Sequence, residues 1–336
     1  MQSLPHPRGP RSQALIESFR TGRASSQLLR AFHEPRDPLG DEDLHLALYL
    51  CYEVHYRGIS GAGADLEWDP DVIAFRAHLE RSFDAALRRV TAPWGADRRW
   101  SPREVTDELQ RLAGMDPRPS LSRYLARGAS SVEFTEFLKL RSLYTLKEAD
   151  PHSFVIPRLS GPAKTALLEI QSDEYGAGRP ERMHSTIFAR TMRAMDLDDR
   201  YGAFLEVAPA STLATVNLVS YLSLHRRLRG AAMGHLALFE STSSVANRRY
   251  ANGLRRLGFG PPVTDYFDEH VEADAVHDMI ATFDVVGQMM REEPTLGDDV
   301  IFGARSLALL EERFSRALLK TWRERRASEE RPRLFA

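Results

Sequence analysis

Apolar residues recur along most of the chain at the i, i+3, i+4 spacing of helices that bury one face. Alternating runs of Val, Ile and Thr, which are typical of strands, are scarce, and proline and glycine clusters separate the apolar segments. The pattern therefore predicts an all-α protein. The expected helices span about 11–21, 24–33, 41–57, 69–91, 102–115, 118–127, 131–149, 161–194, 209–228, 230–256, 262–291 and 299–326.

The breaks in this pattern predict three regions. Residues 1–12 carry three prolines and few apolar side chains, so we expect a flexible tail. The run Ala92-Pro93-Trp94-Gly95 should end one helix, and Ser101-Pro102 with Glu104 supplies the residue types that begin another. We expect an N-terminal helical region at 13–127, a candidate support or dimerisation region for a homodimer, and a C-terminal helical domain at 131–326.

Composition narrows the possible partners. Lys and Arg number 45 and Asp and Glu 47, so the net charge of −2 disfavours nucleic acid as a partner. The single cysteine, Cys51, excludes an intramolecular disulfide, a Cys-rich zinc module and a cysteine-ligated iron–sulfur cluster. No apolar run approaches the roughly 20 residues of a membrane span, and the first residues lack the apolar core of a secretory signal. We therefore expect a cytoplasmic protein with no membrane partner.

Eleven histidines draw attention to metal chemistry, and the clearest pattern lies at 265–280. His270, Asp274 and His277 fall at i, i+4 and i+7, within roughly 60° of arc on one helix face. Apolar residues border that face, which should point inward. Imidazoles and a carboxylate in an apolar core are costly unless a metal satisfies them. The alternative is a helix with solvated His and Asp side chains.

A second pattern lies at 173–188. Glu181 and His184 form a Glu-x-x-His pair, the spacing of di-iron carboxylate sites in helical bundles. Glu174 lies seven residues before Glu181, so all three share a face if the helix is continuous. Two glycines and Pro180 lie between them and should distort the helix. The alternative is a loop in which Pro180 begins a new helix and Glu181 stabilises its N-terminus.

Two isolated glutamates, Glu148 and Glu240, fall on the inward stripes of their predicted helices, although each alone could reach solvent at a helix end. Carboxylates and imidazoles without thiolates suit iron or manganese. Several sets of two histidines and one carboxylate can be drawn, which favours two metals over one. The full candidate set is Glu148, Glu174, Glu181, His184, Glu240, His270, Asp274 and His277.

These residues resemble the haem-oxygenase-like di-iron oxidases and oxygenases, also described as iron-containing redox enzymes. The resemblance covers about 131–290 and rests on Glu148, the block at 173–184, Glu240, and His-x3-Asp-x2-His at 270–277. It implies a seven-helix haem-oxygenase-like bundle, here with an additional N-terminal helical region, that binds two irons and no haem. It also implies the ligands Glu148, Glu181, His184, Glu240, His270, Asp274 and His277.

Glu174 matches the extra carboxylate of family members that oxygenate nitrogen, so it is also the candidate catalytic residue. The resemblance implies an O2-activating enzyme that works through a peroxo-diferric intermediate and receives electrons from an external donor. N-oxygenation of a small amine or guanidine-like substrate is the first expectation. Oxidative desaturation, decarboxylation or C–C cleavage of a fatty or amino acid is the second. A non-catalytic iron-binding helical protein is the alternative from another class.

Overall fold

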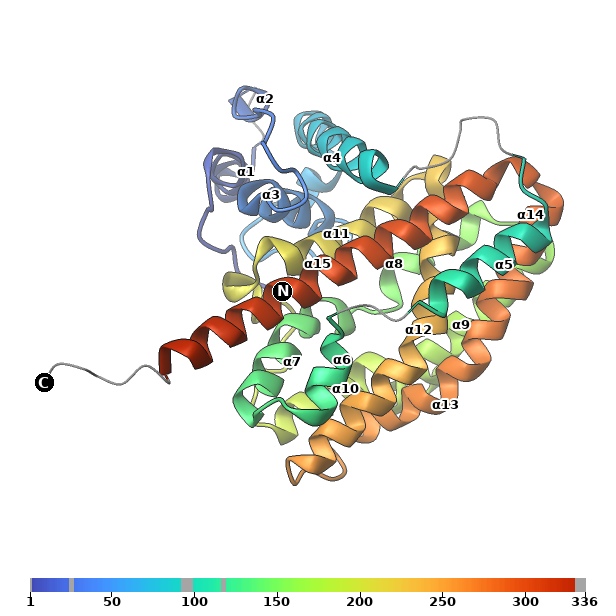
Figure 1. The fold of residues 1–336 in the computed structure, drawn as a ribbon. Coiled ribbons are helices and arrows are strands. Elements are labelled where there is room, and N and C mark those ends of the chain that lie inside the picture. Colours follow the sequence, from blue (N-terminus) through green and yellow to red (C-terminus); the bar gives the residue numbers. More distant parts are fainter. Residues whose placement is uncertain (1, 24–26, 92–98, 116–118, 330–336) are drawn as a thin grey trace, which may run out of the picture.

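The computed structural model describes residues 2–23, 27–91, 99–115 and 119–329, and every regular element among them is a helix (Figure 1). The prediction of an all-α protein is confirmed. None of the helices within these ranges is both long and apolar enough to cross a membrane. The helices of the N-terminal part are α1 (Pro10–Thr21), α2 (Gln27–Arg30), α3 (Glu42–Glu53), α4 (Pro70–Thr91), α5 (Pro102–Ala113) and α6 (Leu121–Arg127).

The C-terminal part forms a bundle around α12 (Arg229–Arg256), which packs against α13 (Asp265–Met279) and the long C-terminal helix α15 (Gly297–Glu329) (Figure 1). A π-helix at Ile280–Val286, η7, continues α13 and packs on α9 (Gly161–Glu174). The other helices are α7 (Ser131–Thr145), α8 (Asp150–Ser153), α10 (His184–Ala194), α11 (Ala210–Leu224) and α14 (Gly287–Glu292).

Two of the predicted helices that carry candidate ligands change course within their length. The segment expected to be helical at 161–194 is broken after Glu174, because Gly176, Ala177 and Gly178 all have positive φ angles. A short 3-10 turn at Pro180–Arg182 follows, and α10 begins only at His184. The segment expected at 262–291 is helical but changes to the wider π geometry at η7.

The predicted start of α5 is confirmed in detail. The Ser101 hydroxyl accepts from the backbone N–H of Glu104, and the Glu104 carboxylate accepts from the backbone N–H of Ser101. The same capping box at Ser130 and Glu133 begins α7. The preceding break expected at 92–95 lies outside the described residues.

Residues 2–12 differ from the flexible tail that their proline content suggested. Gln2 is 5% exposed and its backbone pairs with Ile59. Arg8 donates to the backbone carbonyls of Leu205 and Ala208, and the buried Asp43 carboxylate accepts from the backbone N–H groups that begin α1. Polar contacts to distant segments, which local composition does not report, hold this stretch against the protein.

The N-terminal helices join the C-terminal bundle through one continuous apolar core. Helix α3 packs on α11, and α4 and α5 pack on α15. A buried ion pair crosses the same boundary: Lys147 Nζ donates to Glu53 Oε1 at the end of α3, and both side chains are almost fully buried. The Tyr201 hydroxyl donates to the other Glu53 oxygen at 2.6 Å. Because Lys147 directly precedes Glu148, this network ties the N-terminal part to a candidate ligand.

Candidate metal centre

Four buried side chains from separate elements converge inside the bundle. Glu148 follows α7, Glu174 ends α9, His184 begins α10 and His270 lies in the middle of α13. Each offers one ligand atom, and these four atoms lie within 4.8 Å of one another. The break after Glu174 makes this possible, because it lets the chain turn back and bring the start of α10 beside the end of α9.

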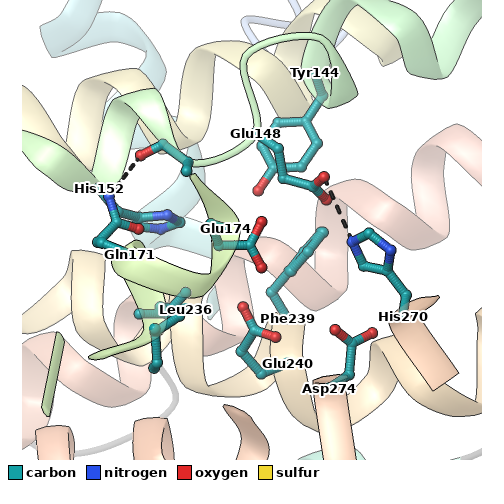
Figure 2. A pocket seen from close by; sticks show the side chains of 12 residues that line it. Tyr144, Glu148, His152, Gln171, Glu174, Leu236, Phe239, Glu240, His270 and Asp274 are labelled. Atoms are coloured by element: carbon teal, nitrogen blue, oxygen red, sulfur yellow. Dashed lines mark hydrogen bonds and ion pairs between the residues drawn. The ribbon is translucent and has the colours of Figure 1, made fainter. Parts of the chain in front are cut away.

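A second group lies beside the first. Glu174, Glu240 of α12 and His277 of α13 also offer ligand atoms within 4.8 Å of one another, and all three are buried. Glu174 belongs to both groups, so a single carboxylate connects them. Figure 2 shows Glu174 and Glu240 directed into the same cavity as Glu148, His270 and Asp274.

A backbone hydrogen bond on the side away from the cluster fixes the orientation of the His270 ring. Its Nδ1 lies 2.7 Å from the Tyr266 carbonyl oxygen, which accepts the Nδ1 proton. Nε2 therefore faces the cluster, 3.7 Å from Glu148. The Tyr266 hydroxyl also donates to both Glu148 oxygens, at 2.8 and 3.1 Å. One tyrosine thus orients two candidate ligands.

His277 presents its other ring nitrogen, Nδ1, to the cluster. Asp173 Oδ2 lies 3.0 Å from His277 Nε2, while His277 Nδ1 faces Glu174 at 3.5 Å and Glu240 at 3.6 Å. The carboxylate–histidine arrangement is the one that fixes metal-binding imidazoles in many metalloproteins. His184 likewise presents Nδ1, which lies 3.0 Å from Glu174 Oε2.

Four polar atoms of the cluster are buried and form no hydrogen bond: Glu174 Oε2, His184 Nδ1, His270 Nε2 and His277 Nδ1. His184 Nδ1 and Glu174 Oε2 are close, but they lack hydrogen-bond geometry. Buried polar atoms without partners are costly, and metal ions bound by the two groups would satisfy all four. The residues therefore fit a metal with nitrogen and oxygen ligands, and the donor set suits iron or manganese.

The metal-free cluster is electrostatically strained. Burial, together with the charge of Glu240, raises the pKa of Asp274 to about 7. Burial disfavours the charged form of His270, but the Glu148 carboxylate outweighs burial and raises the pKa to about 10. Glu240 likewise outweighs burial at His277 and raises that pKa to about 9. In the absence of metal, protonated imidazoles serve as counter-charges for the carboxylates.

The structure brings seven of the eight candidate residues together in the buried cluster, and five of them line the cavity. Asp274 is 1% exposed and lies beside the two compact groups, where it accepts a hydrogen bond from Asn247 at 3.3 Å. Glu181 stays outside and is exposed on the 3-10 turn, with its carbonyl oxygen accepting from Arg190. The ligand role expected for Glu181 is corrected by this placement. Glu-x-x-His spacing aligns two residues only within one helix, and α10 begins after Glu181.

Three residues of the site were not anticipated: Asp173, Tyr266 and His152. Each carries a local signal in retrospect, since Asp173 adjoins Glu174, Tyr266 precedes His270 by four residues, and His152 follows Glu148 by four. Spacing alone identifies them only once the neighbouring ligand is known.

The cavity beside the cluster is mostly apolar on its remaining sides. Apolar and aromatic walls come from Tyr144, Ala149, Ile170, Leu236 and Phe239, and polar groups come from His152 and Gln171. Among the described residues that line it, none is Lys or Arg. A negatively charged ligand group in this cavity would meet no Lys or Arg side chain.

The fold and the cluster together define a class of protein, an all-helical bundle that encloses imidazole and carboxylate ligands suited to iron. The model of a family described as iron-containing redox enzymes matches residues 135–312, more than half of the chain. The chain belongs to the iron-containing redox enzyme family. The resemblance and the haem-oxygenase-like bundle expected from the sequence are confirmed, and the family places the protein among the oxidoreductases.

Two known proteins are similar to this chain. A nitrosourea synthase from Streptomyces achromogenes subsp. streptozoticus is 31% identical over 157 residues, which are 46% of this chain and 32% of that protein. The chain therefore matches about a third of that relative's length. The crystal structure of a CADD-like protein of unknown function from Nostoc punctiforme has a TM-score of 0.53 at 14% identity, covering 66% of this chain and 97% of that one. At this identity the likeness concerns the fold alone.

Proposed function

We propose that this protein is an O2-dependent, non-haem di-iron oxygenase that oxygenates the nitrogen of a small amine or guanidine-like substrate. The observation that carries the proposal is the sharing of Glu174 between two compact, buried ligand groups. Charge supports the same number of ions, because the four buried carboxylates, Glu148, Glu174, Glu240 and Asp274, balance two divalent cations.

The chain's residues would divide the work of holding the two ions. Glu148, His184 and His270 would bind one, Glu240 and His277 the other, and Glu174 both, with Asp274 beside them. Bound iron would supply the activation of O2. The protein's own contribution is to fix the ligands through Tyr266 and Asp173, and to exclude bulk water.

The proposed reaction converts an N–H bond into N–OH. One oxygen atom of O2 enters the product and the other leaves as water, which requires two electrons and two protons. An external donor would supply the electrons. The substrate's nitrogen would lie in the cavity beside Glu174, where the ligand carboxylates and the apolar walls meet.

Two observations favour nitrogen over the carboxylic acids of the alternative chemistry. No Lys or Arg lines the described cavity, whereas an acid substrate needs a cationic partner when it is buried. The similar Streptomyces protein is named for making a nitrosourea, a compound with an oxygenated nitrogen, and this supports the same chemistry here.

The test is an anaerobic Fe(II) titration followed by exposure to O2. We expect close to two irons per chain, and O2 uptake that is accelerated by an amine or guanidine and matched by a product one oxygen atom heavier. Iron that binds without productive O2 uptake with any amine would instead favour the non-catalytic iron-binding protein. Acceleration by fatty or amino acids alone would favour desaturation or C–C cleavage. Binding of a single iron would overturn the di-iron proposal.

A further inference from the structure

The cavity has a second polar end. His152 lies on α8, one helical turn after Glu148, and is 2% exposed. In Figure 2 its ring lies across the drawn lining from His270 and Asp274. His152 Nε2 is buried and has no hydrogen-bond partner. A buried, unpaired polar atom on a cavity wall needs a hydrogen-bond partner, which a water or a bound ligand can supply.

The surroundings of His152 hold it in place without using Nε2. Gln171 donates from its side-chain amide to the Ala149 carbonyl at 2.9 Å and to the Ser153 hydroxyl at 2.8 Å, which fixes the short helix that carries His152. The ring of His235 lies behind, with its centroid 5.7 Å from that of His152. His235 in turn stacks on Phe239 of the cavity wall. The imidazole is therefore preorganised for binding.

His152 is an uncharged group at neutral pH. Burial lowers its pKa to about 4, and burial likewise lowers that of His235 well below its ordinary value. A neutral imidazole offers one donor and one acceptor and no net charge. The carboxylates lie at the other end of the cavity, and Ile170, Leu236 and Phe239 line the space between.

The open space in this cavity is only about 10 Å³, enough for one water molecule, so a ligand that reaches from Glu174 to His152 has to displace the side chains of the walls. Such a ligand would carry its nitrogen near Glu174, a short apolar stretch against the walls, and its other end at His152. A carboxylate there would lack a basic partner, and a second cation would lack an acidic one. An amide, urea or hydroxyl group can be satisfied by a neutral imidazole.

We propose that His152 is a substrate-binding residue whose Nε2 hydrogen-bonds an uncharged polar group at the end of the substrate remote from the oxidised nitrogen. The inference rests on the proposed function for the identity of the other end. It makes His152 a determinant of specificity, because a substrate without such a group would leave the imidazole buried and unpaired.

The test compares three guanidines that differ only at the remote end: γ-guanidinobutyramide, γ-guanidinobutyrate and butylguanidine. Their affinities are measured calorimetrically on the full chain loaded with Mn(II), which avoids turnover. We expect the amide to bind about tenfold more tightly than butylguanidine and than the carboxylate. Equal affinities, preference for the carboxylate, or no binding of the amide would overturn the proposal.

Variants assign the preference to His152. His152→Phe should remove the preference for the amide, and His152→Gln, which keeps a polar group, should restore part of it. Both variants should retain the metal stoichiometry and circular dichroism of the unmodified chain. If His152→Phe misfolds, the proposal is tested by His152→Gln, whose preference for the amide should lie between that of the unmodified chain and none. Loss of metal in His152→Gln would make His152 a ligand and overturn the proposal. Failure of the unmodified chain to bind two irons would count against the proposed function instead.

Discussion

Asp173, a half-exposed residue, contacts His277, a buried residue of the ligand cluster. Asp173 Oδ2 lies 3.0 Å from His277 Nε2, yet the Asp173 side chain is 49% exposed whereas that of His277 is 4% exposed. The contact turns His277 Nδ1 toward Glu174 and Glu240. A surface carboxylate thereby sets which nitrogen a buried imidazole presents to a metal.

Removing the Asp173 carboxylate should weaken metal binding without removing a ligand. We expect Asp173→Asn to lower Mn(II) affinity by roughly 10- to 100-fold, the usual effect of losing the partner of a metal-binding histidine. Glu169→Gln, an exposed acid on the same helix, is the control and should leave the affinity unchanged. Equal affinities in the two variants would show that Asp173 has no orienting role.

The sharing of Glu174 predicts different stoichiometries for two glutamate variants. Glu174→Ala removes a ligand atom from both groups and should weaken the binding of both ions. Glu240→Ala removes a ligand atom from one group only and should leave about one iron per chain. Glu181→Ala should retain two, because that side chain is exposed outside the cluster. Iron is counted after anaerobic loading and desalting. Two irons in Glu174→Ala would contradict the shared role.

Metal binding should release protons and strengthen as the pH rises. In the metal-free protein, carboxylates outweigh burial and raise the pKa of His270 to about 10 and that of His277 to about 9, so both are protonated at neutral pH. Ligation requires the neutral ring, so each binding imidazole loses a proton. We expect Mn(II) affinity to rise at least tenfold between about pH 7 and about pH 8. Calorimetry in buffers of different protonation enthalpy counts the protons, and zero released would refute the assignment.

The buried pair of Glu53 and Lys147 should be costly to break from one side. Glu53→Gln leaves a buried ammonium without its partner, and we expect a loss of about 3–5 kcal/mol of unfolding free energy. Replacing both residues, as Glu53→Leu with Lys147→Met, should recover most of it.

Urea denaturation measures these changes. The exposed pair of Arg103 and Asp107 is the control, and Asp107→Asn should change stability by less than about 1 kcal/mol. If the single Glu53 variant were no less stable than this control, the pair would not contribute to the native state.

Protonation of His45 in the unfolded chain should destabilise the protein as the pH falls below about 6.5. Burial lowers the pKa of His45 from 6.5 to about 4, so the unfolded chain binds a proton there at a higher pH than the native chain. Stability contributed by neutral His45 is complete above about pH 6.5, falls as the pH drops through this window, and is lost by about pH 4. His45→Gln should flatten the dependence by up to about 1.4 kcal/mol per pH unit. Urea denaturation with a chelator present measures the free energy of unfolding at each pH. If the unmodified chain and His45→Gln lost stability in parallel as the pH fell, the role of His45 would be contradicted.

Periodicity predicted the site where the ligands share one helix. His270, Asp274 and His277 keep a common face because α13 is continuous through all three. The stripes of the predicted helices also placed Glu148 and Glu240 inward, and both are buried, although Glu148 lies in the turn that follows α7. The rule needs an unbroken helix and no knowledge of neighbouring elements.

The same rule was misleading at Glu181, where positive φ angles at Gly176 and Gly178 break the helix and move the glutamate to the surface. Asp173 and His152 escaped prediction for a different reason. Their significance depends on contacts with His277 and with a cavity wall, which come from other helices. Packing of distant segments decides such positions, as it does for residues 2–12.

The crowding of four acids in one cavity has a consequence for the life of the protein in a cell. Without metal, these side chains and the strained imidazoles beside them raise the free energy of the folded chain, whereas two bound cations lower it by mass action. Chains that never acquire metal should then open more often and be removed by proteases. We expect the steady-state abundance of this protein to follow the supply of iron, even where its synthesis is constant.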